Sequence, residues 1–431
     1  THTMILQLCG LTALLAASVI ATPDDQAGQE DVQARLERLE SHNLELSRRL
    51  DILADELERE QLGDSLFAPV PDRGSYGLAP AASKVYSTER GVSIGGYGEV
   101  LYKNPTGDGA SDELDLLRAI LYVGTKIDEH WLINSEFEFE HASTGADGEV
   151  SVEFLHLEYL HRPELNFRGG LVLVPMGFVN ELHEPTTFLS AARPVTEQRI
   201  LPSTWRENGL AVFGSSGSLS YRTYVLNGFD ATGFSSAGLR GGRQKGSKAL
   251  AEDLAWVGRL DWEAVAGLTL GASAYLGKSG QNQDSSGGAV PDTNTSIGEL
   301  HAEWRGGGFA ARALLVRAEL DDVSELNSAL GLTGTSSIGE RLEGGYVELG
   351  YDVLTALAPV SNQSLTPFVR FETLDTQAEV PGGFASNPSN DQEIMTMGIQ
   401  WKPVPQVVVK ADYEDRDRGA DQWNLLVGYV F

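Results

Sequence analysis

The sequence contains a single cysteine, Cys9, which lies in the first apolar segment. If that segment is removed, no thiol remains for a disulfide or for a cysteine-ligated zinc site. After that segment there is no run of 18 or more apolar residues, so no transmembrane helix follows it. A membrane is not excluded, because a β-barrel distributes its apolar residues in alternation and its average composition looks polar.

Basic residues are also scarce, with 32 Lys and Arg against 61 Asp and Glu, a formal charge of −29. This argues against nucleic acid as a partner, since binding it requires Lys and Arg to neutralise phosphates. Catalytic signals are weak. His156 and His161 fall on opposite faces of one strand-like segment and cannot share a metal. His183 beside Glu184 could be an acid–base pair, although such a pair in a Pro-rich loop is more often structural. We expect no enzyme activity, no cofactor and no metal.

The N-terminal region contains two different segments. Residues 4–21 read as the apolar part of a secretory signal with a cleavage site near Ala21, so we predict a signal peptide over 1–21. The basic residues that usually precede such a segment are missing, which suggests a truncated or modified start. Residues 22–61 contain an unbroken heptad pattern typical of a parallel coiled coil. The predicted oligomerisation residues are Leu36, Leu39, Asn43, Leu46, Leu50, Leu53 and Leu57. A single amphipathic helix is the alternative. Residues 62–90, rich in Pro and Gly, read as a linker.

From residue 91 to residue 431 the sequence is a succession of strand-like segments separated by polar loops. Apolar side chains alternate with charged ones within many of these segments, and about 16 segments occur, as expected for a barrel of porin size. Short connections alternate with long ones, notably at 231–250, 279–293, 322–340 and 374–390. The predicted fold is therefore all-β: a transmembrane antiparallel barrel of about 16 strands, preceded by a short helical coiled coil. In these segments the charged residues share one face, which we expect to line the lumen. The predicted lumen-lining residues are Arg118, Glu136, Glu138, Glu140, Arg259, Arg370, Glu372 and Lys410. On the opposite face of one such segment, Leu117 is grouped with Ala119, Leu121 and Val123. A soluble β-sandwich also alternates, but it does not explain charges in the middle of so many strands.

The last strand-like segment places Trp423, Leu425, Val427, Tyr429 and Phe431 on one face. An apolar face with aromatic residues at both ends is expected where a strand crosses hydrocarbon. Tyr429 and Phe431 resemble the signal by which bacterial outer-membrane barrels are recognised, which predicts the barrel assembly machinery as a partner.

The longest interruption of the alternation is 175–208, which is rich in Pro and polar residues. Irregular backbone at membrane depth is tolerated only inside protein or along a water-filled cavity, so we expect this segment to fold inward and constrict the pore. The predicted constriction residues are Glu181, His183, Glu184, Arg193, Arg199, Arg206 and Glu207. An external loop packed on the rim is the alternative.

The stretches GGYGEVLYKN (95–104), NSEFEFEHA (134–142), GLVLVPMGFVNELHEPTTF (170–188), ILPSTWRENG (200–209) and RGGRQ (240–244) resemble the phosphate-selective porin O and P family. The resemblance covers residues 91–431 and implies a 16-stranded, usually trimeric, outer-membrane porin, in some members with a periplasmic coiled coil. Phosphate-selective members line the pore with arginines and lysines. Here lysines are sparse and the predicted lumen carries glutamates, so the resemblance does not fix the solute.

The sequence thus predicts a porin of a bacterial outer membrane, with its N-terminal helix in the periplasm, that passes small anionic or neutral solutes by diffusion. Its expected partners are outer-membrane lipid and two further copies in a homotrimer. A structural protein that tethers the barrel to periplasmic partners through the coiled coil is the alternative function.

Overall fold

The computed structural model describes residues 35–54, 69–107, 111–142 and 148–431, and the chain divides into two compact units, Thr1–Gly63 and Asp64–Phe431. In the first unit, residues 35–54 are helical, and Arg49 pairs with Glu45 one turn earlier at 2.6 Å. The heptad residues Leu36 to Leu53 are exposed in this single chain. The predicted signal peptide, Cys9 and Leu57 lie outside the described residues. No helix in the described ranges is long and apolar enough to cross a membrane.

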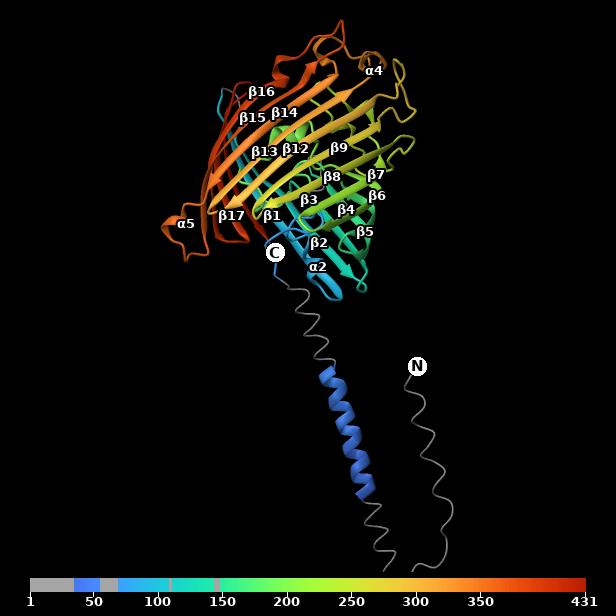
Figure 1. Ribbon diagram of the computed structural model, residues 1–431, viewed down its shortest axis with the longest axis vertical. Coiled ribbons are helices and arrows are strands. Elements are labelled where there is room, and N and C mark those ends of the chain that lie inside the picture. The colour runs from blue at the N-terminus through green and yellow to red at the C-terminus, as the bar shows by residue number, and fades with distance from the viewer. Residues whose placement is uncertain (1–34, 55–68, 108–110, 143–147) are drawn as a thin grey trace, which may run out of the picture. The chain divides into compact units, whose positions relative to one another are not determined.

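The second unit is a closed antiparallel barrel of sixteen strands, as the alternation predicts. The strands are β1 (Gly91–Pro105), β2 (Glu113–Lys126), β3 (Trp131–Glu140), β4 (Val150–Arg162), β5 (Leu165–Leu173), β6 (Arg206–Ser216), β7 (Leu219–Asn227), β8 (Leu254–Val265), β9 (Leu268–Lys278), β12 (Asn294–Gly306), β13 (Phe309–Leu320), β14 (Arg341–Tyr351), β15 (Ser364–Glu379), β16 (Asp391–Val404), β17 (Val407–Arg416) and β18 (Gln422–Val430). Each strand pairs with its neighbour in the chain, and β18 pairs with β1 to close the barrel. Figure 1 shows the blue first strand beside the red last strands.

The alternation of apolar and polar side chains in the sequence corresponds to the outer and inner faces of the barrel wall. In β18 the apolar residues Trp423, Leu425, Val427 and Tyr429 are exposed on the outer face, as is Phe431 directly after the strand, while the intervening residues are buried. Outward apolar residues recur on β12 to β16, so the whole outer wall follows the same pattern. This is the arrangement of a barrel whose outside meets hydrocarbon and whose inside is polar.

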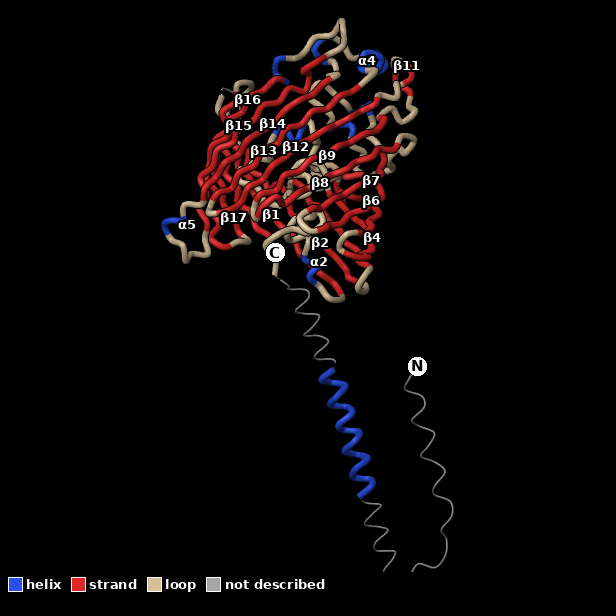
Figure 2. Tube along the Cα trace, viewed as in Figure 1, coloured by secondary structure: helices blue, strands red, loops and turns tan. Residues whose placement is uncertain are grey.

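The two rims of the barrel differ in the length of their connections. One rim carries short turns, including 217–218, 266–267, 307–308 and 405–406, together with the 12-residue connection 352–363 that contains α5 (Leu354–Leu357). The other, the long-loop rim, carries 228–253, 279–293, 321–340 and 380–390 (Figure 2). These loops contain η1 (Ala231–Gly233), η2 (Arg240–Gly242), the hairpin β10 (Asp284–Ser285) and β11 (Gly288–Ala289), α4 (Val323–Leu330), η3 (Gly334–Ser336) and η4 (Pro388–Asn390). The predicted asymmetry of the rims is confirmed, although β15 extends to Glu379, farther than the predicted loop 374–390 allows.

Irregularities of register interrupt the alternation at defined places. One lies between β1 and β2, where Glu99 pairs with Arg118 but Val100 pairs with Leu116. Leu117 is the extra residue of this bulge and packs against an inner cluster that includes Leu101. Its grouping with the outward residues Ala119 and Leu121 was therefore wrong, because a bulge switches the face of the residues on one side of it.

Residues 69–90, which lie in the linker predicted for 62–90, are packed inside the barrel. Leu78, Ala81, Ala82 and Val85 are buried, and the segment includes the one-turn helix α2 (Lys84–Ser87). The cluster that holds Leu78, Ala81 and Ala82 also contains inner-face residues of the barrel such as Tyr97 and Tyr122. This stretch, the N-terminal lumen segment, is therefore part of the barrel's interior.

Candidate functional site in the barrel lumen

Residues 174–205, which connect β5 to β6, form an inner segment that contacts strands on several sides of the barrel. Its side chains and backbone bond to residues of β3, β8, β13, β15 and β17. Inward folding was predicted for 175–208. Arg206, Glu207 and Asn208 instead belong to β6, because Arg206 pairs with Leu173 and the ladder to β5 starts there.

The first part of the inner segment is held by arginines of the wall. Glu181 forms an ion pair with Arg222 of β7 at 3.0 Å and lies 3.6 Å from Arg259 of β8. Arg259 also donates to the carbonyl of Gly177 and pairs with Asp261 at 2.9 Å. A buried carboxylate needs a partner of opposite charge, and the two arginines supply it for Glu181.

The middle of the inner segment connects two parts of the lumen. His183 lies 3.1 Å from Glu136 of β3 and 3.7 Å from Glu153 of β4. Glu184 accepts from the backbone N–H groups of Ala81 and Ala82 at 2.8 and 3.2 Å. The adjacent residues predicted as a possible acid–base pair thus point to different partners, and Glu184 anchors the N-terminal lumen segment.

Further along, the inner segment is bound mainly through its backbone. Lys402 donates to the carbonyl of Thr186 and Lys410 to that of Ser190, at 2.8 and 2.9 Å. The ammonium of Lys410 also lies 3.7 Å from the ring centroid of Phe188, a cation–π contact. Arg370 lies 3.7 Å from Glu372.

The short helix α3 (Val195–Arg199) fixes the last part of the inner segment. Glu197 accepts from the hydroxyl of Tyr346 at 2.6 Å and from the N–H groups of Phe178 and Val179 at 2.8 and 2.7 Å. Burial raises the pKa of Glu197 above its usual range, against the lowering effect of the bonds from Tyr346 and Val179. One side chain therefore ties together both ends of the inner segment and the wall.

The predicted lumen-lining residues all lie on the inner face of the barrel wall, and most of them form ion pairs. Arg118 is 3.1 Å from Glu99 and 3.8 Å from Glu138. Glu140, at the end of β3, is half-buried. Several inner charged residues were not predicted from the sequence. These are Glu99, Glu153, Glu158, Arg168, Arg222, Asp261, Glu299, His301, Arg312 and Glu348.

Alternation would have found most of these unpredicted residues, but not Glu153. The ladder between β3 and β4 changes register between Glu136 and Phe137, so that Glu153 and Phe154 are both buried. A strict period of two places neighbouring residues on opposite faces, and the bulge breaks that rule here.

The N-terminal lumen segment closes one side of the lumen near the short-turn rim. Asn134 of β3 donates to the carbonyl of Ala82 at 2.9 Å, and Lys84 donates to that of Ile94 at 2.8 Å. Tyr86 donates to Glu158, whose carboxylate also pairs with Arg168 at 2.7 Å.

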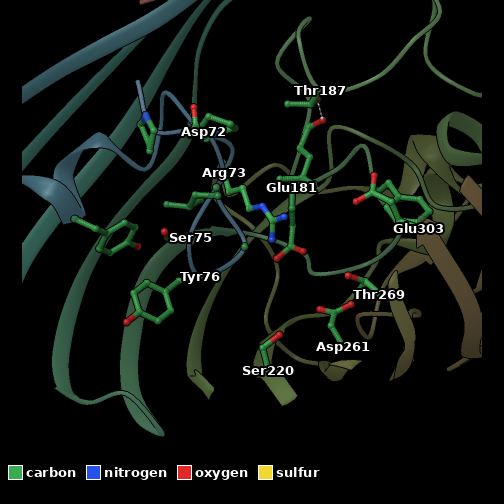
Figure 3. A pocket seen from close by; sticks show the side chains of 18 of the residues that line it. Asp72, Arg73, Ser75, Tyr76, Glu181, Thr187, Ser220, Asp261, Thr269 and Glu303 are labelled. Atoms are coloured by element: carbon green, nitrogen blue, oxygen red, sulfur yellow. Dashed lines mark hydrogen bonds between the residues drawn. The ribbon is translucent and has the colours of Figure 1, made fainter. Parts of the chain in front are cut away.

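A cavity of about 920 Å³ remains between the N-terminal lumen segment, the inner segment and the wall. Figure 3 shows Glu181, Asp261, Thr269 and Glu303 among the residues that line it. Arg222, Arg259, Arg305 and Lys402 line it as well. The cavity therefore presents both signs of charge and has room for hydrated small solutes.

The arginines near the long-loop rim differ from those of the wall. Among the described residues, Arg199, Arg240 and Arg243 have no carboxylate within the 4.0 Å of an ion pair, and the same holds for Arg193, which lies deeper in the lumen near Tyr97 and His183. Arg243 donates instead to the carbonyls of Pro202 and Thr204. Burial, together with the positive charges of Arg240 and Arg206, lowers the pKa of Arg243 to about 9, so it remains charged at neutral pH. This local group of positive charges, which we call the rim arginines, can attract anions.

Comparison with solved structures supports the fold at low sequence identity. OmpF of Salmonella typhi, solved in complex with daunomycin, superposes with a TM-score of 0.54 and 13% identity, covering 80% of this chain and 99% of that chain. A loop L8 deletion mutant of OmpT, an outer membrane protein of Vibrio cholerae, gives 0.52 and 12% over 80% of this chain and 100% of that chain. The fold of this chain is that of outer-membrane porins.

Comparison of sequences gives a relative but no family model. No family model matches the chain. A protein of Aquifex aeolicus (strain VF5), described as an uncharacterized protein, is 39% identical over 353 residues, which cover 79% of each sequence. The chain therefore belongs to the same family as this Aquifex aeolicus protein.

Proposed function

We propose that this chain is a passive channel of a bacterial outer membrane, through which small hydrophilic solutes diffuse past a constriction formed by the inner segment. The observation that carries the proposal is the combination of an apolar outer wall with a charged lumen that contains residues 174–205. An apolar exterior needs a hydrocarbon environment, and irregular backbone in such a barrel is stable because it lies inside.

The lumen supports passage rather than chemistry. Its acids and bases are paired across the wall and the inner segment, as in Glu181 with Arg222 and Arg206 with Glu153. Paired charges of both signs provide hydrogen-bonding groups for hydrated solutes without a strong net field, which favours weak selectivity.

The rim arginines give a reason to propose a modest preference for anions. None of them has a carboxylate of the described residues at ion-pair distance, and local charge governs a narrow entrance even in a protein with a formal charge of −29. The sequence resemblance to the phosphate-selective porin O and P family agrees with this preference. The paired glutamates of the lumen argue against a dedicated phosphate channel.

A planar bilayer experiment tests the channel. The purified full chain is reconstituted, and its reversal potential is measured in a potassium chloride gradient before and after addition of phosphate. We expect discrete conductance steps with a weak anion preference and no block by micromolar phosphate. Block by micromolar phosphate would instead assign the phosphate-selective role, and absence of conductance would refute the channel.

One observation favours a second candidate function, a structural tether. The N-terminal lumen segment and the inner segment touch each other through Glu184, which narrows the lumen between them. If the barrel does not conduct, we propose that it anchors the predicted periplasmic coiled coil, and that this coiled coil carries the function. Trimerisation, the signal peptide and recognition of Tyr429 and Phe431 by the barrel assembly machinery belong to the proposal of an outer-membrane channel.

A further inference from the structure

We propose that Glu136, Glu153 and His183 form a binding site for one divalent transition-metal ion of the zinc class, which joins the inner segment to the barrel wall. These residues are called the lumen triad below. Each offers one ligand atom, and the three atoms lie within 4.8 Å of one another. The inference does not depend on whether the barrel conducts.

The spacing of the ligand atoms suits a tetrahedral ion. His183 Nε2 is 3.1 Å from Glu136 Oε1 and 3.7 Å from Glu153 Oε2. Two ligands of a tetrahedral zinc, each about 2.0–2.2 Å from the metal, are separated by about 3.3 Å. The two distances from His183 lie on either side of this value, and the ligand atoms of the two glutamates lie within 4.8 Å of each other.

The orientation of the histidine is fixed by its other nitrogen. His183 Nδ1 lies 3.0 Å from the carbonyl oxygen of Asn180, which can only accept, so Nδ1 carries a hydrogen. In the neutral ring, Nε2 then directs a lone pair at two carboxylates. That arrangement is repulsive unless a cation lies between them, either a proton or a metal ion. A histidine that donates its second nitrogen to a carbonyl is the usual arrangement around a protein-bound metal.

Two carboxylate oxygens supply an independent observation. Glu136 and Glu153 are 0% exposed, and among the described residues Oε2 of each has no hydrogen-bond partner. Arg206 binds the opposite oxygen of Glu153, Oε1, at 3.1 Å and leaves Oε2 facing His183. Buried carboxylate oxygens without a partner are costly, and coordination of a cation beside His183 would satisfy Oε2 of Glu153.

The surroundings of the lumen triad carry charges of both signs. The acids are Glu99, Glu136, Glu138, Glu153 and Glu184, the bases are Arg118, Arg193 and Arg206, and the charges of Arg240 and Arg243 also act on Glu153. Glu136 has no Lys or Arg partner among the described residues, so His183 is its only ion-pair contact there. Histidine nitrogen with carboxylate oxygen is a donor set that suits zinc and its neighbours better than calcium or magnesium.

A second buried histidine provides a matched control. His301 has Glu299 on Nδ1 and Asp261 on Nε2, each at 2.7 Å, and Arg259 also lies 3.0 Å from Nε2. Its acids lie on opposite sides of the ring, so they do not converge on one nitrogen. His301 is therefore buried and ion-paired like His183, but it is not arranged to hold an ion together with both acids.

The test measures metal retained by the full chain. Wild type, His183→Gln, Glu136→Gln and His301→Gln are refolded in detergent with or without Zn²⁺, passed through gel filtration, and analysed by mass spectrometry of the metal. Refolding in the presence of the ion avoids any barrier to its entry into a closed site. Circular dichroism and heat-dependent gel mobility select the variants that have folded, and Glu136→Gln keeps the test available if His183→Gln does not fold.

We expect about one zinc ion per chain in wild type and in His301→Gln, and markedly less retained zinc in the two triad variants, because each of them lacks one ligand. Co²⁺ in place of Zn²⁺ should give visible absorption bands in wild type that Glu136→Gln loses. Equal zinc content in all folded proteins, or no zinc in wild type, would overturn the proposal and leave His183 as an imidazolium paired with Glu136.

Discussion

The ring of Phe431 covers Gly96 on the outer wall, so that a Cβ atom on the glycine would lie 2.7 Å from the ring's Cζ. The backbones of the same residues exchange hydrogen bonds of 2.9 and 3.1 Å, which closes the seam between β18 and β1. Phe431 thus pairs with β1 through its backbone and covers Gly96 with its ring.

This contact predicts that Gly96→Val weakens barrel closure. Overpacking of a tight contact costs about 1–3 kcal/mol. The cost here falls on the seam and also on the pairing of β1 with β2, because the same Cβ would lie even closer to the backbone oxygen of Ile120. Thermal unfolding followed by heat-dependent gel mobility should show a lower midpoint. Gly298→Val is the control, since nothing lies within 4 Å of a Cβ at that outward position on β12. An equal loss in both variants would show that the seam has no special role.

Substitution of two inward glycines can separate the roles of the N-terminal lumen segment and the inner segment in conduction. A Cβ on Gly124 would lie 2.7 Å from the side chain of Val85 in α2, and one on Gly428 would lie 2.8 Å from Pro185 in the inner segment. We expect Gly124→Val to displace the N-terminal lumen segment and raise the single-channel conductance. Gly428→Val should instead disturb the inner segment and increase current noise. An unchanged conductance in Gly124→Val would place the N-terminal lumen segment away from the conducting path.

The rim arginines predict a charge effect that depends on position. Arg240→Gln removes a cation that has no ion-pair partner among the described residues, so the anion preference of the reversal potential should fall. Lys278→Gln removes the same charge near the same rim, but Lys278 is exposed and paired with Asp292 at 2.5 Å. Equal shifts in both variants would indicate general surface charge rather than a local anion site.

The heptad pattern predicts that Asn43 limits the association of the helical segment. Asn43→Leu should raise the thermal stability of the helices and permit more than one oligomer size, because a polar residue at this position fixes oligomer state at a cost in stability. Chemical crosslinking of the purified chain measures the sizes present. A single species that is the same in wild type and variant would remove Asn43 as a determinant of oligomer state.

Alternation was sufficient to predict the wall of the barrel. The strands around Glu136, Arg370 and Lys410 show a clear period of two, and each of these charged residues is buried on the inner face. The strongest signals came from strands with a uniformly apolar outer face, because that face meets a single environment along its whole length.

The sequence was least informative where contacts are distant or the period breaks. Glu184 binds the backbone of Ala81, 103 positions away in the chain, and no local pattern in residues 69–90 indicates that contact. Glu153 was missed because it sits at a bulge. Arg206 and Glu207 were assigned to the loop because their strand begins with polar residues, which local propensity does not distinguish from an irregular segment.

The seam also constrains the order in which the molecule can be assembled. Gly96 and Phe431 are joined only after all the intervening strands have been made, and two segments of irregular chain lie enclosed by the wall that they complete. A barrel that closed first would have to admit those segments through one of its rims. Insertion of the lumen contents before the last pair of strands meets avoids that step, so the slow event of folding should be the final closure, which joins the residues most distant along the chain.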